Sequence, residues 1–195
     1  HRTVAAIIHN VKYDDVTGYQ RTPAKSVNFG LLYGMGPEKL AKTLSIPLHE
    51  AKNIMGTYLG TLTKISEFIN QSAELLRYNG YTETLDGRRR YIPKIYSEDV
   101  WERRAAEREG MNHRIQGTNA DLMKLAMIDI YDAIEAQRLN SKLVLQVHDE
   151  VVIDVYPGEE KFLKEDIIKI MESRIHLDVP MIAEGCYAPT WAAAH

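Results

Sequence analysis

Two cations and two aromatic side chains recur at every fourth position near the start of the chain. They are Arg21, Lys25, Phe29 and Tyr33, in the stretch RTPAKSVNFGLLYG. On a helix they would form one flank, because residues four apart lie on the same face. At about 1.5 Å per residue this flank is about 18 Å long, which is enough to follow a nucleoside triphosphate from its phosphates to its base.

The order of these side chains also suits a nucleotide. The cations come first, where the helix dipole and free N–H groups favour an anion. Lys25 can act as a point charge and Arg21 as a planar fork on phosphate oxygens, while Phe29 and Tyr33 offer flat faces to sugar and base. The alternative is a half-buried helix whose aromatic rings pack inward and whose cations are solvated.

A second polar series has the same spacing. Arg108, Asn112 and Gln116 lie four residues apart and precede an apolar stretch. Such side chains can hydrogen-bond the acceptors of a nucleic-acid minor groove, which vary little with base sequence. The alternative is an exposed, ion-paired helix face, because Glu107 and Glu109 lie alongside.

A third candidate is the stretch LQVHDEVVIDV, in which His148, Asp149 and Glu150 separate two apolar runs. Carboxylates at a tight turn between strands would be rigidly held. Mg²⁺ takes oxygen ligands and usually one or two protein carboxylates, with water and phosphate completing its shell. We expect Asp149 to be the ligand; the alternative is an acidic hairpin turn with no further role.

Helices are expected to carry the first half of the chain. Thr22 and Pro23 have the residue types of an N-cap and a first helical residue, and Gly34 to Pro37 those of a stop, which predicts a helix over about 22–35. Residues 48–78 keep an apolar spacing of three to four, with a break near Gly60, and form a predicted helical scaffold.

The second half mixes helix and strand. Asp86-Gly87 between β-prone flanks predicts an Arg-rich hairpin over 81–93. Residues 100–138 are expected to form one long or bent helix, whose later part is apolar nearly all round, as if buried between layers. Two strand-like runs flank His148-Asp149, an amphipathic helix follows over about 158–173, and a last strand is predicted at 181–186. This pattern indicates an antiparallel α+β fold.

Composition limits the class of protein. The 195 residues are 45% hydrophobic, so the chain can bury a hydrophobic core. Its net charge of -3 excludes a uniformly basic surface for binding nucleic acid, and the arginines instead cluster between Arg88 and Arg114. A single cysteine, Cys186, and the lack of a membrane-length apolar run lead us to expect a reducing cytosolic setting and no membrane partner. Because the chain begins at His1 rather than Met, we expect a piece of a longer protein.

Together these features resemble the C-terminal part of the family A DNA polymerases, of the bacterial DNA polymerase I type. RTPAKSVNFGLLYGMG resembles motif B of the fingers, TLDGRRRYIP and ERRAAEREGMNHRIQGTNADLMKLAMI resemble the connecting segments, and LQVHDEVVIDV resembles palm motif C. The resemblance covers the whole chain. It implies fingers over 1–115 and distal palm over 116–195, with the motif C hairpin at 142–156, in a right-hand polymerase that lacks its thumb and motif A strand here.

The resemblance also implies a role for each candidate residue. Arg21 and Lys25 would bind the triphosphate of a dNTP, Phe29 would line its sugar, and Tyr33 would lie against the templating pair. Asp149 would ligate catalytic metal, with Glu150 beside it and His148 at the primer end or the triphosphate. The DNA contacts would come from Arg103, Arg108, Asn112 and Gln116.

The implied reaction is attack of a primer 3′-hydroxyl on the α-phosphate of a dNTP, assisted by two Mg²⁺ ions. In this family a second aspartate, from motif A, shares the metals, and no such segment occurs in this sequence. We therefore expect the chain to need the remainder of the polymerase and to be inactive alone, in a bacterial cytosol or a phage-infected cell. Two alternatives remain: a single-subunit phage-type RNA polymerase, and a non-catalytic remnant that binds nucleic acid.

Overall fold

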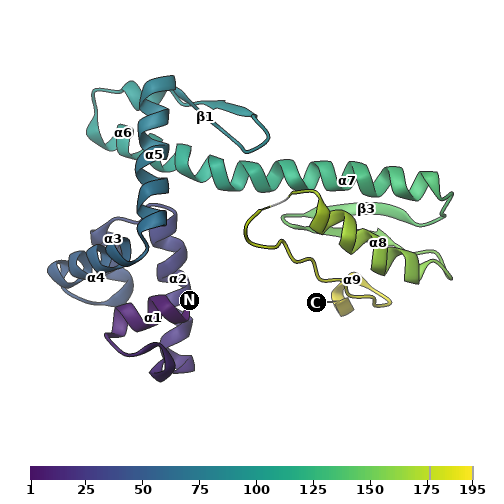
Figure 1. The fold of residues 1–195 in the computed structure, drawn as a ribbon, viewed down its shortest axis with the longest axis horizontal. Helices are drawn as coiled ribbons and strands as arrows, with labels where there is room; N and C mark the ends of the chain where they lie inside the picture. The colour runs from purple at the N-terminus through teal and green to yellow at the C-terminus, as the bar shows by residue number, and fades with distance from the viewer. Residues whose placement is uncertain (176, 195) are drawn as a thin grey trace. The chain divides into compact units, whose positions relative to one another are not determined.

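The computed structural model describes residues 1–175 and 177–194, which fold as two compact units (Figure 1). The first unit comprises His1–Glu83 and Arg88–Arg114, and the second comprises Thr84–Gly87 and Ile115–His195. None of the described helices has the length and apolarity that a bilayer crossing requires.

Helices dominate the first unit. In chain order these are α1 (Arg2–His9), α2 (Gly18–Leu32), α3 (Pro37–Leu44), α4 (Leu48–Thr61), α5 (Thr63–Asn79) and α6 (Val100–Asn112), with short 3₁₀ turns at Tyr13–Asp15 and Pro93–Tyr96. Leu62, between α4 and α5, has φ −101° and ψ 63°, so the helical scaffold breaks there rather than at Gly60. The core that α1 to α4 share includes Val27, Leu31, Leu40 and Tyr58.

The predicted start of α2 at Thr22 and Pro23 is wrong. Thr17 caps the helix instead, because its hydroxyl accepts the Gln20 N–H (3.3 Å) and the Gln20 side chain accepts the Thr17 N–H (3.0 Å). This reciprocal capping box satisfies two N–H groups that the first turn leaves spare. Pro23 therefore lies inside the helix, where its ring removes one backbone donor.

The Arg-rich segment is a short antiparallel ribbon. β1 (Tyr81–Glu83) pairs with β2 (Arg89–Tyr91), with Tyr81 opposite Tyr91 and their ring centroids 5.3 Å apart. Gly87, in the connecting turn, has φ +83°, a backbone conformation that glycine adopts readily.

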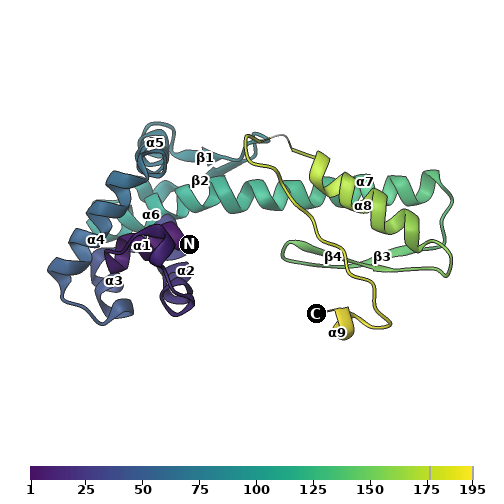
Figure 2. The same cartoon turned by 60° about the horizontal axis from the view of Figure 1, so that its bottom comes forward.

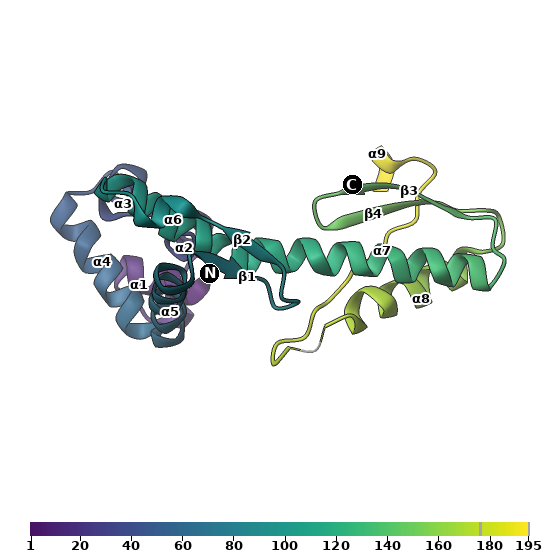
Figure 3. The same ribbon diagram turned by 90° about the horizontal axis from the view of Figure 1, so that it is seen from above.

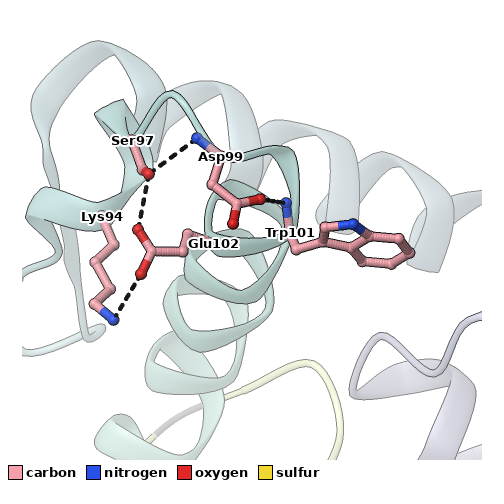
Figure 4. Close-up of polar contacts among 5 residues, drawn as sticks. All are labelled: Lys94, Ser97, Asp99, Trp101 and Glu102. Atoms are coloured by element: carbon pink, nitrogen blue, oxygen red, sulfur yellow. Dashed lines mark hydrogen bonds and ion pairs between the residues drawn. The ribbon is translucent and has the colours of Figure 1, made fainter.

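A polar network sets the start of α6 (Figure 4). The Asp99 carboxylate accepts the Trp101 N–H at 2.7 Å, which makes Asp99 the N-cap. Glu102 in the first turn accepts from the Ser97 hydroxyl (2.7 Å) and from Lys94 (3.2 Å), and these two bonds lower its pKa. The start of α6 is therefore specified locally.

The long or bent helix expected over 100–138 is a continuous helical run that contains a π-helical turn. A π-helical turn, His113–Gly117, follows α6 and leads into α7 (Thr118–Ala136). The second unit continues with β3 (Lys142–Val147), β4 (Glu150–Asp154), α8 (Glu160–Ser173) and the short α9 (Trp191–Ala194).

The second unit is built around an antiparallel pair, β3 and β4, with a bulge between Leu143 and Leu145. In all three ribbon views this pair lies between α7 on one side and α9 on the other (Figures 1, 2 and 3). The buried centre is formed by Ile130 and Ile134 of α7 with Leu163 and Ile167 of α8.

Two expectations for this unit are wrong. α7 is not buried all round, because α8 and β3 cover one stripe of it and leave Ile128 and Tyr131 55% and 58% exposed. Residues 181–186 form no strand in the structure; the Ala183 N–H donates instead to the Glu172 side chain of α8 at 3.0 Å. A strand needs a partner edge, and this segment bonds a helix side chain instead.

Candidate functional site

Three of the four side chains lie on the solvent side of α2, and the fourth, Tyr33, is its C-cap residue and is half-buried. Ala24, Val27 and Leu31 are buried on the helix's core side, whereas Arg21 and Lys25 are exposed and Phe29 is 41% exposed. The rings of Phe29 and Tyr33 are nearly parallel, with centroids 6.4 Å apart and planes at 10°. The alternative in which the aromatic rings pack into the core does not hold for Phe29.

The cations of this flank are available to an anion. Within the described part of the chain neither Arg21 nor Lys25 forms an ion pair. Because α2 begins at Gly18, Arg21 lies at the end of the first turn and Lys25 one turn further along. The helix dipole therefore adds less to anion binding at Lys25 than the sequence led us to expect, because the effect of the dipole fades within the first turn.

The back of α2 is tied to α4. The buried Tyr58 hydroxyl donates to the side-chain oxygen Oδ1 of Asn28 at 3.0 Å, and burial raises the pKa of Tyr58, so the hydroxyl keeps its proton. Gly30 lies against the flexible end of the Met35 side chain. The Tyr58–Asn28 bond, together with the buried Ala24, Val27 and Leu31, holds the core side of α2 in place and leaves Phe29 on the exposed side.

Arg108 of α6 lies against the turn that ends α2. Gly34 has φ +79°, and a Cβ there would lie 2.6 Å from Arg108 Cγ. The neighbouring acidic residues do not pair with Arg108; Glu107 binds Arg77 and Glu109 binds Arg90. The predicted ion-paired face exists, but its cations come from α5 and β2.

The other predicted DNA contacts differ in their surroundings. Asn112 is half-buried, and its side-chain amide oxygen Oδ1 is buried without a hydrogen-bond partner among the described residues. Arg103 donates to the backbone oxygens of Ser97 (2.6 Å) and Glu98 (2.8 Å), which gives it a local structural role. Gln116 is exposed in the π-helical turn and belongs to the second unit.

A pocket of about 550 Å³ opens between α7 and the turn that joins β3 to β4. Two methionines of α7, Met123 and Met127, contribute to its lining. Its polar side chains come from the π-helical turn, from α7 and from the β3–β4 hairpin: Gln116, Asn119, Lys124, Gln146, His148 and Asp149. Three residues predicted from the sequence, Gln116, His148 and Asp149, are thus brought together.

The turn at the pocket has an unusual backbone. His148 has φ 53°, a left-handed conformation that costs a residue with a side chain about 1–2 kcal/mol. The Gln146 side chain donates to the His148 carbonyl oxygen at 2.5 Å and so supports this conformation. Glu150, paired with Val147 across the ladder, is absent from the pocket lining and accepts a hydrogen bond from the Trp191 indole at 2.8 Å.

Asp149 fits part of a magnesium site. Its carboxylate is exposed at the pocket, and Mg²⁺ accepts one or two protein carboxylates with water and phosphate. No group of three or more His, Cys, Asp or Glu side chains suited to a metal occurs among the described residues. The chain therefore offers a carboxylate ligand but not a complete protein cage.

Sequence reasoning missed several residues of this site. Lys124 and Asn119 line the pocket, and Lys124 lies eight residues after Gln116, a continuation of the four-residue spacing that could have identified it. The Tyr58–Asn28 and Trp191–Glu150 hydrogen bonds join residues 30 and 41 positions apart. Neither residue type nor local spacing in the sequence predicts a pair at such a separation.

Comparison with known proteins identifies the family and the fold of the chain. The family model for DNA polymerase family A matches residues 1–193. The chain is 37% identical to DNA polymerase I of Borreliella burgdorferi over its whole length and 40% identical to that of Caldicellulosiruptor bescii over 98% of it, and in each case it spans 22% of the relative.

A solved structure with the same fold is the POL domain of Pol1 from M. smegmatis, in a complex with DNA primer-template and dNTP. It matches the entire chain with a TM-score of 0.92 and 37% identity, and the match covers 34% of that domain's chain. The α+β fold is therefore that of a fragment of a polymerase domain. The residues matched and the fold they adopt show that the chain belongs to DNA polymerase family A.

Proposed function

We propose that this chain is the fingers and distal palm of a template-directed DNA polymerase, which transfers a nucleotide from a dNTP to a primer 3′-hydroxyl. The observation that carries the proposal is on α2 and its C-cap, where Arg21 and Lys25, which form no ion pair with any described residue, precede the stacked rings of Phe29 and Tyr33. Residues 1–115 are assigned to the fingers and 116–195 to the distal palm.

On α2, Lys25 neutralises charge on the reacting phosphates and Arg21 binds the outer oxygens as a fork. Phe29 lines the sugar, and Tyr33 lies against the templating base pair. These roles are supported by the order of the four side chains, which follow one another at every fourth position along α2 and its C-cap. The bond between Tyr58 and Asn28 holds the opposite side of α2.

In the pocket of the second unit, Asp149 holds catalytic metal and His148 contacts the primer end or the triphosphate. Two Mg²⁺ ions, when bound, supply charge stabilisation at the attacking and leaving oxygens. Arg108, Asn112 and Gln116 contact primer and template, and Arg103 supports α6 beside the DNA backbone. Glu150 lies beside Asp149 and acts on the metal site by helping to hold the β3–β4 turn in place.

The partners are primer-template DNA, dNTPs and the remainder of the polymerase, including its thumb and the second catalytic aspartate. The solved relative, bound to DNA primer-template and dNTP, supports the first two. Support for the third is length, since the chain spans 22% of the curated relatives named above. We place the protein in a bacterial cytosol or a phage-infected cell.

The test replaces Lys25 by Ala in the complete polymerase that carries this chain. Steady-state primer extension should show kcat/KM for dNTP reduced by at least about 100-fold, because a charge on the reacting phosphates is lost. The matched control is Lys39→Ala, an exposed lysine at another helix of the same unit, which should leave extension unchanged.

The same assay separates the alternatives. Preferential use of rNTPs by the unmodified protein would identify a phage-type RNA polymerase. DNA binding without any incorporation would identify a remnant that only binds nucleic acid. Equal activity of Lys25→Ala and Lys39→Ala would contradict the role given to α2.

A further inference from the structure

The side chain of Glu150 is directed away from the pocket that contains Asp149. Gln146 is paired with Val151 in the β3–β4 ladder, and Val147 with Glu150, so these successive pairs lie on opposite faces of the sheet. Gln146 lines the pocket and Val151 packs against the α7–α8 core. Glu150 is consequently on the other face, next to an aspartate that faces the pocket.

That other face is covered by α9. The Trp191 indole N–H donates to the Glu150 carboxylate at 2.8 Å, across 41 residues of sequence. Figure 3 shows α9 on the far side of the β3–β4 pair from α7. The indole nitrogen is a donor only and a carboxylate is an acceptor only, so this pairing suits both groups.

The turn is thus held from both faces. On the pocket side Gln146 donates to the His148 carbonyl oxygen, and on the α9 side Trp191 holds the residue that follows Asp149. Asp149 lies between these two attachments. Its backbone is fixed although its neighbour His148 has the left-handed φ of 53°.

We propose that Trp191 and Glu150 are positioning residues, which orient the Asp149 carboxylate by holding the β3–β4 turn from the side opposite the pocket. This inference rests on the proposed function, because orientation matters to catalysis only if Asp149 binds the catalytic metal. Trp191 also keeps the Glu150 charge out of the pocket, where it would repel a triphosphate or compete for a cation. Glu150 contacts no substrate in this role.

The experiment uses four single variants of the complete polymerase and one double variant, which combines Trp191→Phe with Glu150→Ala. Trp191→Phe keeps an aromatic ring but lacks the donor, Glu150→Ala lacks the acceptor, and Glu150→Gln keeps an acceptor oxygen without the charge. The matched control is Trp101→Phe, because Trp101 is the other tryptophan of the chain, is exposed, and its indole makes no hydrogen bond among the described residues.

Single-nucleotide incorporation at saturating dNTP should fall about tenfold in Trp191→Phe and in Glu150→Ala, as is usual when a supporting partner of a metal ligand is lost. KM for dNTP should stay constant, and the Mg²⁺ concentration for half-maximal rate should rise equally in both. The double variant should be no worse than either single one, and Glu150→Gln and Trp101→Phe should match the unmodified enzyme.

A different pattern would overturn the proposal. If Glu150→Gln lost as much activity as Glu150→Ala while Trp191→Phe kept full activity, Glu150 would be a metal ligand itself. Additive losses in the double variant would show that the two residues act separately.

Hydrogen exchange provides a readout that does not need catalysis. Measured by mass spectrometry on the peptide spanning 142–156, exchange should accelerate in Trp191→Phe and in Glu150→Ala but not in Trp101→Phe. Unchanged exchange would refute the attachment even in an active enzyme. If the unmodified protein incorporated no nucleotide, the proposed function would fail while the exchange result would still decide whether Trp191 holds the turn.

Discussion

At the scale of single residues, the side chains proposed to meet substrate differ in their surroundings from those that hold a neighbour. Lys25 and Asp149 are exposed on their units, whereas the Tyr58 hydroxyl and the Trp191 indole each donate a hydrogen bond to a residue far away in the sequence. Local sequence chemistry could indicate the first kind, because spacing and residue type are visible in the chain. It could not indicate the second kind, because those bonds depend on the folded path.

Asp149 should be indispensable for incorporation but not for DNA binding. In the complete polymerase, Asp149→Ala should reduce single-turnover incorporation by at least about 100-fold, because a metal ligand is lost. DNA affinity, measured by fluorescence anisotropy, should change little. Asp154→Ala is the control, since Asp154 is an exposed aspartate at the end of the same hairpin. Incorporation that survives in Asp149→Ala would disprove the metal assignment.

At the scale of elements, the turn signal was reliable, the helix-cap signal was ambiguous, and the signal for strand pairing over a long range failed. Asp86-Gly87 predicted the β1–β2 ribbon correctly because a turn depends mainly on its own residues. The cap was misplaced because the Thr17–Gln20 box competes with Thr22 and Pro23. The strand expected at 181–186 failed because pairing needs an edge elsewhere in the fold, which no local pattern reports.

The turn after α2 should tolerate no side chain at Gly34. Gly34→Ala should destabilise the first unit by about 1–2 kcal/mol, because φ is +79° and the new Cβ would displace Arg108. Gly56→Ala, within α4 and with open space around it, should instead stabilise by up to about 1 kcal/mol. Chemical denaturation of the complete polymerase measures both. Equal effects of the two substitutions would contradict the proposed crowding at Arg108.

At the scale of the whole molecule, the chain is a fragment of a family A polymerase domain, and each of its two units carries its own set of proposed functional residues. The first unit holds the α2 side chains and Arg108, and the second holds the pocket with Asp149. The family and the α+β class were predictable from the sequence because several motifs occur in the correct order. The exposed Ile128 and Tyr131 were not, since an apolar pattern does not reveal how many layers cover a helix.

Residues 1–195 alone should not extend a primer. Mixed with primer-template, four dNTPs and Mg²⁺, the isolated chain should give no product above background on a denaturing gel, while the complete polymerase does. The reason is chemical, because two-metal catalysis needs a second carboxylate and the described residues contain no metal-suited group of three or more side chains. Robust extension by the isolated chain would contradict this.

The left-handed backbone of His148 lowers the stability of the β3–β4 hairpin. A glycine or asparagine would adopt its φ of 53° at lower cost, so the hairpin is less stable than its geometry allows. A sequence optimised for folding alone would have a different residue at this position. If His148 contacts the primer end or the triphosphate as proposed, its place in the pocket lining is a compromise between stability and activity. Directed evolution for heat resistance would then be expected to replace His148 early and to lose turnover as a result.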